Sequence, residues 1–172
     1  MTAYIRHRWN HRLAAHRAAV RISNRILRRV PFWIKYGLGQ RARCNKLPYS
    51  IINEYSTVLQ IGAPADTLHA GRSRAMHFAL LAPKGRVVVI EPDRRSAEQF
   101  RALCKERDLV NVSVKEVGAW SSKKKLRLHV DPRHPATNFS EGSTDYDQKR
   151  LRDFETHDVD VDTLDNILTS EG

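Results

Sequence analysis

Two apolar segments, Thr57–Ile61 and Arg86–Ile90, constrain the fold of this chain more than any other feature, because they enclose a segment of helical composition at Arg72–Leu81. Gly62 directly follows the first of them, which is typical of a strand that enters a tight turn. The second is continuously apolar after its first residue, as expected when both faces of a parallel sheet are covered. The pattern predicts strand, helix and strand, the first βαβ unit of a Rossmann-like α/β domain.

The alternation of strands and helices continues along the chain. A helix is expected at Ser96–Arg107 and a strand at Asn111–Val117, which together repeat the unit and predict a partial doubly wound sheet. Apolar residues then alternate with polar ones over 126–130, which predicts a half-exposed hairpin arm. Residues 131–157 have the composition of a surface loop, and residues 159–168 that of a short strand running into a helix.

The N-terminal part of the chain differs from the rest in its charge. The formal net charge is +11, yet residues 1–46 hold 12 of the 30 Lys and Arg side chains and no Asp or Glu. The remaining residues carry 18 basic and 19 acidic side chains, a net charge of −1. We therefore expect two parts, a basic helical N-terminal arm over 1–46 and one Rossmann-like domain over 47–172.

The arm has apolar residues at helical spacing over the first 35 positions. Pro31, followed by Gly37 and Gly39, is expected to end the helix, and a second short helix is expected at Tyr49–Tyr55, after Pro48. Acid-free, Arg-rich and aromatic, the arm could lie on an anionic membrane surface or track the phosphates of a nucleic acid. A solvated helix packed on the domain is an equally good interpretation.

Two residues in the βαβ unit suggest a cofactor site. A nucleoside needs the backbone to approach closely where the first strand ends, and a carboxylate at the end of the second strand to accept hydrogen bonds from the ribose hydroxyls. Gly62 is at the first position and Glu91 at the second. Pro92 keeps the backbone of Glu91 extended. The alternative role for Glu91 is to cap the following helix, and we favour ribose binding.

The turn after the first strand discriminates between cofactors. A dinucleotide site has three glycines spaced as G-x-G-x-x-G, with an acid about 20 residues further on. The loop here, Gly62–Thr67, has one glycine, and Glu91 follows it after 29 residues. A cofactor without a pyrophosphate, such as S-adenosylmethionine, fits this loop better than NAD does. An NAD-binding oxidoreductase fragment remains an alternative, as does a non-enzymatic binding module that works through the basic arm.

Four sequence blocks resemble successive motifs of FkbM-type methyltransferases, in the right order and at suitable intervals. They are VLQIGA at Val58–Ala63, PKGRVVVIEPD at Pro83–Asp93, NVSVKEVGAWS at Asn111–Ser121 and VDTLDNIL at Val161–Leu168. The resemblance implies a class I methyltransferase fold, S-adenosylmethionine as cofactor, and O-methylation of a sugar or another small hydroxylated acceptor.

The resemblance also assigns cofactor-binding residues. It implies that Gly62 and Ala63 border the methionine moiety, that Glu91 binds the ribose, and that Val117 and Gly118 lie near the adenine. The chain departs from the family pattern D-x-G-A-N-x-G. It has Gln60 before the glycine, where the pattern has an acid, and no second glycine soon after it. Asp66 is a candidate replacement for the missing carboxylate. The sequence identifies no catalytic residue and no metal site.

The family's next block, an apolar strand that ends in an acid, would follow VDTLDNIL, but the sequence stops at Gly172. We therefore expect a C-terminally truncated family member or half of a complex. In either case the strand at Val58–Ile61 becomes an open apolar edge, which favours self-association. Cys44 and Cys104 lie far apart and no apolar segment is long enough to span a bilayer, so we expect a cytoplasmic protein, peripheral at a membrane if the arm binds one.

Overall fold

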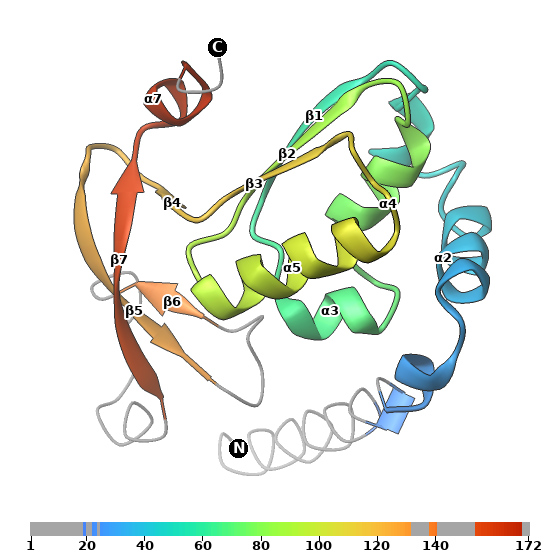
Figure 1. Cartoon of the computed structure of the whole chain (residues 1–172), viewed down its shortest axis with the longest axis horizontal. Coiled ribbons are helices and arrows are strands. Elements are labelled where there is room, and N and C mark those ends of the chain that lie inside the picture. Colours follow the sequence, from blue (N-terminus) through green and yellow to red (C-terminus); the bar gives the residue numbers. More distant parts are fainter. Residues whose placement is uncertain (1–18, 20–21, 24, 132–137, 141–153, 170–172) are drawn as a thin grey trace, which may run out of the picture.

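The computed structural model describes residues 19, 22–23, 25–131, 138–140 and 154–169 (Figure 1). Its first sheet is parallel and has the order β1-β2-β3, with β1 at Thr57–Ile61, β2 at Arg86–Ile90 and β3 at Val112–Lys115. The three strands expected from their apolar patterns are therefore present and adjacent.

Helices connect these strands and pack on them. α3 (Ala65–His69) and α4 (Arg74–Leu81) lie between β1 and β2, and α5 (Arg94–Glu106) lies between β2 and β3. α2 (Phe32–Arg41) precedes the sheet and packs against α4. A short 3₁₀ turn at Tyr49–Ile51 stands where a longer helix was expected. The core between sheet and helices includes Tyr36, Leu68, Met76, Val87, Val89 and Phe100.

A second sheet follows the first along the chain and lies beside it in Figure 1. It has the order β4-β7-β5-β6, with β4 at Gly118–Ala119, β5 at Lys124–Val130, β6 at Phe139–Ser140 and β7 at Glu155–Asp162. β4 is parallel to β7, while β5 is antiparallel to both β7 and β6. α7 (Leu164–Thr169) ends the described chain. The fold is α/β, with a parallel and a mixed sheet compatible with a Rossmann-like domain.

One expectation about the N-terminal arm is corrected. Among its described residues, 22–23 and 25–29 are helical, and Pro31 separates them from α2 as expected. Gly37 and Gly39, however, lie inside α2 and do not end a helix. A Cβ on Gly39 would lie 2.6 Å from Cε1 of His77, so this glycine lets α2 approach α4 closely. Packing requires glycine here, which outweighs its low helix propensity.

The long loop expected over 131–157 is also corrected where the structure describes it. β6 lies inside that range, and β7 begins at Glu155, four residues before the expected strand. Cross-strand pairing with β5 extends β7, because Val130 pairs with Glu155 and Leu128 with His157. Polar residues at these positions hid the strand from a search for apolar alternation. Residues 132–137 and 141–153 lie outside the described residues.

His77 is a fully buried histidine in the core beneath α2. Burial, with the nearby Arg43 guanidinium adding to it, lowers its pKa to about 4 although the carbonyl of Gly71 accepts a hydrogen bond from its ring. The ring is therefore neutral in the folded protein at pH 7. Because its pKa is lower in the folded chain than in the unfolded one, the stability it confers is present above pH 6.5 and is lost as the pH falls towards 4.

We expect the free energy of unfolding to fall by roughly 3 kcal/mol more in the wild type than in His77→Gln between pH 7 and pH 4. Glutamine keeps a hydrogen-bond donor but cannot take up the proton. Urea unfolding at a series of pH values measures the difference, and His157→Gln, at an exposed position on β7, is the matched control. Equal pH slopes in the wild type and His77→Gln would contradict the assignment.

β1 is the edge strand of the parallel sheet. Within the described residues it pairs with β2 alone, and its outer side carries no charge to deter pairing. Leu59 and Ile61 are 38% and 51% exposed. The open apolar edge expected from the sequence is thus found in the described structure.

We expect the chain to self-associate through this edge in sedimentation velocity experiments. Leu59→Lys should shift the population towards monomer, since two facing lysines repel at a self-paired strand. Val110→Lys, at a position 94% exposed beside the start of β3, should not change the distribution. A wild-type chain that sediments as a single monomeric species at every concentration would refute this prediction.

Candidate cofactor site

The turn after β1 exposes its backbone to open space. Gly62 has a φ of +79°, a conformation that glycine adopts without strain. Its N–H donates to the carbonyl of Ile90 over 2.8 Å, so the turn is held to the end of β2. A Cβ on Gly62 would meet no atom within 4 Å. The glycine thus leaves room beside the carboxyl ends of both strands, where a ligand could approach the backbone.

Glu91 lies at that same edge of the sheet, directly after β2, and is only 5% exposed. Its carboxylate accepts hydrogen bonds from the N–H of Ala63 over 2.5 Å and from the N–H of Asp93 over 3.0 Å. Asp93, not Glu91, caps α5, because its Oδ2 accepts from the backbone N–H of Ser96 over 3.1 Å. Glu91 therefore does not cap the helix, and it joins the β1 turn to the end of β2.

The environment of Glu91 has opposing effects on its ionisation. Burial raises the pKa of the carboxyl above its ordinary value and the neighbouring Asp93 charge raises it further, whereas the two backbone N–H donors oppose the shift. A carboxylate offers about four acceptor positions, of which these donors occupy two. Hydroxyl donors from a ligand could fill the others, and they would stabilise the charged form.

A cavity of about 290 Å³ lies over this edge. Gly62 and Glu91 line it together with Gly118, which starts β4. The second sheet closes the cavity with apolar side chains from β5 and β7. Such a combination of apolar walls with few polar groups is usual for small-molecule sites. The other lining residues are Ile61, Pro64, Pro92, Ala119, Trp120, Leu126, Leu128, Asn138, Ser140, Val159 and Val161.

Three of the six residues predicted for the cofactor line this cavity, namely Gly62, Glu91 and Gly118. Ala63 lies behind the turn, 3% exposed, and contributes its N–H to Glu91. Asp66, in the first turn of α3, lines a neighbouring cleft. Val117 lines a third depression with lysines at the end of β3 and at the start of β5.

Gln60 occupies the position where the FkbM pattern has an acid. Its side chain is 7% exposed, and Nε2 donates to the carbonyl oxygens of Ile61 and Gly62 over 2.8 and 3.0 Å. Gln60 therefore stabilises the turn from inside the protein. Asp66 does not take over an acid's place in the cavity, since its Oδ1 accepts from the N–H of Thr67 over 2.9 Å within α3.

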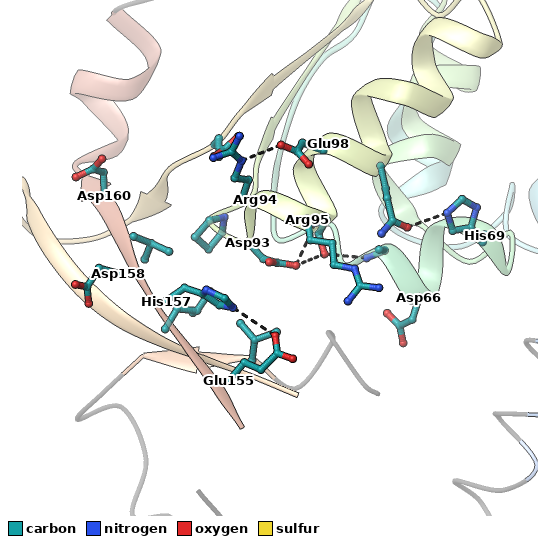
Figure 2. A pocket seen from close by; sticks show the side chains of 18 of the residues that line it. Asp66, His69, Asp93, Arg94, Arg95, Glu98, Glu155, His157, Asp158 and Asp160 are labelled. Carbon is teal, nitrogen blue, oxygen red and sulfur yellow. Dashed lines mark hydrogen bonds and ion pairs between the residues drawn. The ribbon is translucent and has the colours of Figure 1, made fainter. Parts of the chain in front are cut away.

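The neighbouring cleft is larger, about 660 Å³, and strongly polar (Figure 2). Arg94 and Arg95 from the start of α5 line one side of it, and Glu155 and His157 from β7 line the other. Nε2 of His157 lies 3.6 Å from Oε2 of Glu155. The two cavities share Pro92, Leu128 and Val159 as lining residues, so they adjoin.

Sequence reasoning missed the part of the site that the second sheet supplies. Asn138 lines the smaller cavity, and its buried Oδ1 has no hydrogen-bond partner among the described residues. Trp120, 38% exposed, lines the same cavity. The alternating apolar residues of β5 signalled a strand with one covered face, but nothing in the sequence indicated what that face covers.

The chain matches no profile of a known protein family, and no curated protein matches its sequence. In the part of the chain that the structure describes, no three His, Cys, Asp or Glu side chains are grouped so that they could hold a metal ion. None of the described helices is long and apolar enough to cross a membrane.

Proposed function

We propose that the chain is an S-adenosylmethionine-dependent methyltransferase of the FkbM type, acting on a hydroxyl group of a sugar or another small acceptor. The observation that carries the proposal is the buried carboxylate of Glu91, which lines one cavity with Gly62 and Gly118 at the carboxyl edge of a parallel sheet. Ligands of open α/β sheets bind at this edge.

The residues of the cavity fit a nucleoside. The unused acceptor positions of Glu91 suit two ribose hydroxyls. The Oδ1 of Asn138, which has no hydrogen-bond partner among the residues described, suits an amine donor such as that of adenine. Gly62 leaves space for the chain that extends from the ribose. The apolar side chains of β5 and β7 exclude water from the base. When bound, the cofactor would supply an electrophilic methyl group.

The adjoining cleft suits the acceptor. Its arginine and carboxylate side chains can bind a ligand with several polar groups, and because it shares a wall with the smaller cavity, ligands bound in the two would be neighbours. Holding donor and acceptor in contact is the main contribution that a protein makes to such a transfer. The part of the chain that the structure describes gives no side chain the role of catalytic base in this proposal.

The same turn argues against NAD. A pyrophosphate binds free backbone N–H groups at the start of the helix after β1. Here three of these N–H groups are already used: Ala63 donates to Glu91, Ala65 to Oγ of Ser96 over 3.2 Å, and Thr67 to Asp66. Pro64 has no N–H to donate, and α3 has only five residues. Three N–H groups at the start of this helix are therefore engaged within the protein, which disfavours a phosphate there.

Isothermal titration of the full chain with S-adenosylmethionine, S-adenosylhomocysteine and NAD tests the proposal. We expect both adenosyl ligands to bind and NAD to give no heat. Gly62→Ala should weaken binding at least tenfold, because the new methyl group enters the cavity. Gly71→Ala is the matched control, since Gly71 also has a positive φ, +71°, but does not line the cavity. Binding of NAD alone would favour the oxidoreductase alternative.

A further inference from the structure

The helix α2 is apolar on two opposite faces. Phe32 and Tyr36 are buried on the inner face, where the hydroxyl of Tyr36 donates to the carbonyl of Leu68 over 2.7 Å. Trp33, Ile34 and Leu38 are 59%, 54% and 60% exposed. At about 100° per residue, these three lie within an arc of about 140° that also contains Gly37 and Arg41. We call this arc the outer face of α2.

The helical residues that precede α2 repeat this combination of apolar and basic side chains. Ile22 and Ile26 are 62% and 60% exposed and lie one helical turn apart. Arg25 and Arg29, also exposed, have the spacing that places them on the same side of the helix as the two isoleucines. Exposed aliphatic side chains thus alternate with cations through the described part of the arm.

The outer face of α2 is remote from the cofactor cavity, whereas Arg28, among the helical residues before α2, lines the neighbouring polar cleft. α2 lies at the edge of the molecule in Figure 1, on the side away from the second sheet. Lys35, between the two faces, donates from Nζ to the carbonyl of His69 over 2.7 Å and ties α2 to α3. The buried Phe32 and Tyr36 and the hydrogen bond of Lys35 thus fix α2 to the domain, and Trp33 of the outer face contacts the Phe32 ring edge-on, with the centroids 4.8 Å apart.

The chemistry of the outer face favours one occupant. A second copy of this chain would bring two acid-free basic segments together, because the first acidic residue of the sequence is Glu54. A nucleic acid would neutralise the arginines but leave Ile22, Ile34 and Leu38 in water. A bilayer with anionic headgroups accommodates both the apolar and the basic side chains, since aliphatic side chains and Trp enter the headgroup boundary while Arg pairs with lipid phosphates.

We propose that the outer face of α2, together with the helical residues before it, docks the protein on an anionic lipid surface. Burial of five exposed apolar side chains, two before α2 and three on its outer face, supplies the attachment, and the arginines select anionic headgroups. The helix does not cross the bilayer, since it has only ten residues. Docking through α2 would hold the α/β domain against the membrane.

Co-sedimentation of the full chain with vesicles tests the proposal. We expect the wild type to bind vesicles of phosphatidylcholine mixed with phosphatidylglycerol and to bind phosphatidylcholine alone much more weakly. A triple variant, Trp33→Ser, Ile34→Ser and Leu38→Ser, should lose more than tenfold in affinity. Arg41→Gln should lower the affinity about fivefold for the anionic vesicles and leave the affinity for phosphatidylcholine vesicles unchanged. Val110→Ser, which removes an exposed apolar residue elsewhere, should bind like the wild type.

Circular dichroism of each variant checks that the fold persists, and the single variant Ile34→Ser replaces the triple one if that chain does not fold. Wild-type protein that stays in the supernatant with both kinds of vesicle would overturn the proposal. So would binding that the apolar substitutions leave unchanged. Binding to a uridine homopolymer that depends on Arg41 but not on the three apolar residues would identify the surface as a nucleic-acid site instead.

Discussion

Replacing Glu91 by alanine is expected to lower the free energy of unfolding by about 2–4 kcal/mol and to abolish binding of S-adenosylmethionine. The substitution leaves the buried N–H groups of Ala63 and Asp93 without an acceptor. It also removes one of the links between the β1 turn and the end of β2, leaving the hydrogen bond from Gly62 to Ile90, and it removes the acceptor proposed for the ribose. For a chain of this length, the expected fall in Tm is roughly 5–15 °C.

Thermal unfolding and titration of the same samples measure the two effects together. Glu91→Gln keeps one acceptor oxygen, so it should destabilise the fold less than Glu91→Ala does. It should still weaken ligand binding strongly. Glu116→Ala is the surface control, because Glu116 is about one-third exposed and pairs with Arg101 over 3.0 Å, and it should change stability by less than about 1 kcal/mol. A stable Glu91→Ala protein with unchanged affinity would contradict both roles of the carboxylate.

Replacing Gly85 by alanine is expected to destabilise the fold by at least about 3 kcal/mol. Gly85 immediately precedes β2, and a Cβ there would lie 2.1 Å from the backbone oxygen of Ser56, just before β1. The neighbouring N–H of Arg86 donates to that same oxygen over 3.1 Å. Because the obstacle is backbone, relief requires the two strands to separate at the start of their pairing.

Gly37→Ala is the matched control for this prediction. Gly37 lies in α2 and a Cβ there would meet nothing within 4 Å, so alanine should stabilise the protein by about 0.5–1 kcal/mol through its higher helix propensity. Urea unfolding of the two variants measures free energies that should change in opposite directions. A Gly85→Ala chain as stable as the wild type would show that β1 and β2 do not approach this closely at their start.

The sequence predicted the parallel sheet well because its central strand, β2, is buried. Val87 and Val89 are fully buried on β2, and the continuous apolar run there identifies a covered strand wherever it occurs. The second sheet was harder to predict, since β7 reads Glu-Thr-His-Asp before its first valine and owes its length to pairing with β5. Pairing between two segments that are distant in the chain leaves little trace in the sequence of either segment alone.

Some residues of the candidate site could likewise be predicted from the sequence and others could not. Gly62 and Glu91 were predictable because the ends of adjacent parallel strands must meet at one edge of the sheet. Asn138 was not predictable, because its place in the cavity depends on β6 pairing with β5. The outer face of α2 was hidden for a different reason. Its apolar spacing is ordinary for a helix, and only the observed exposure of Trp33 and Leu38 shows which face is uncovered.

A crystal structure of the full chain with S-adenosylhomocysteine tests the central claim most directly, since it locates the nucleoside. We expect the ribose in the cavity bounded by Gly62, Glu91 and Gly118, with its hydroxyl oxygens about 2.6–3.0 Å from the carboxylate of Glu91. A nucleoside bound in the larger cleft beside Arg94, or one whose ribose makes no contact with Glu91, would contradict the account.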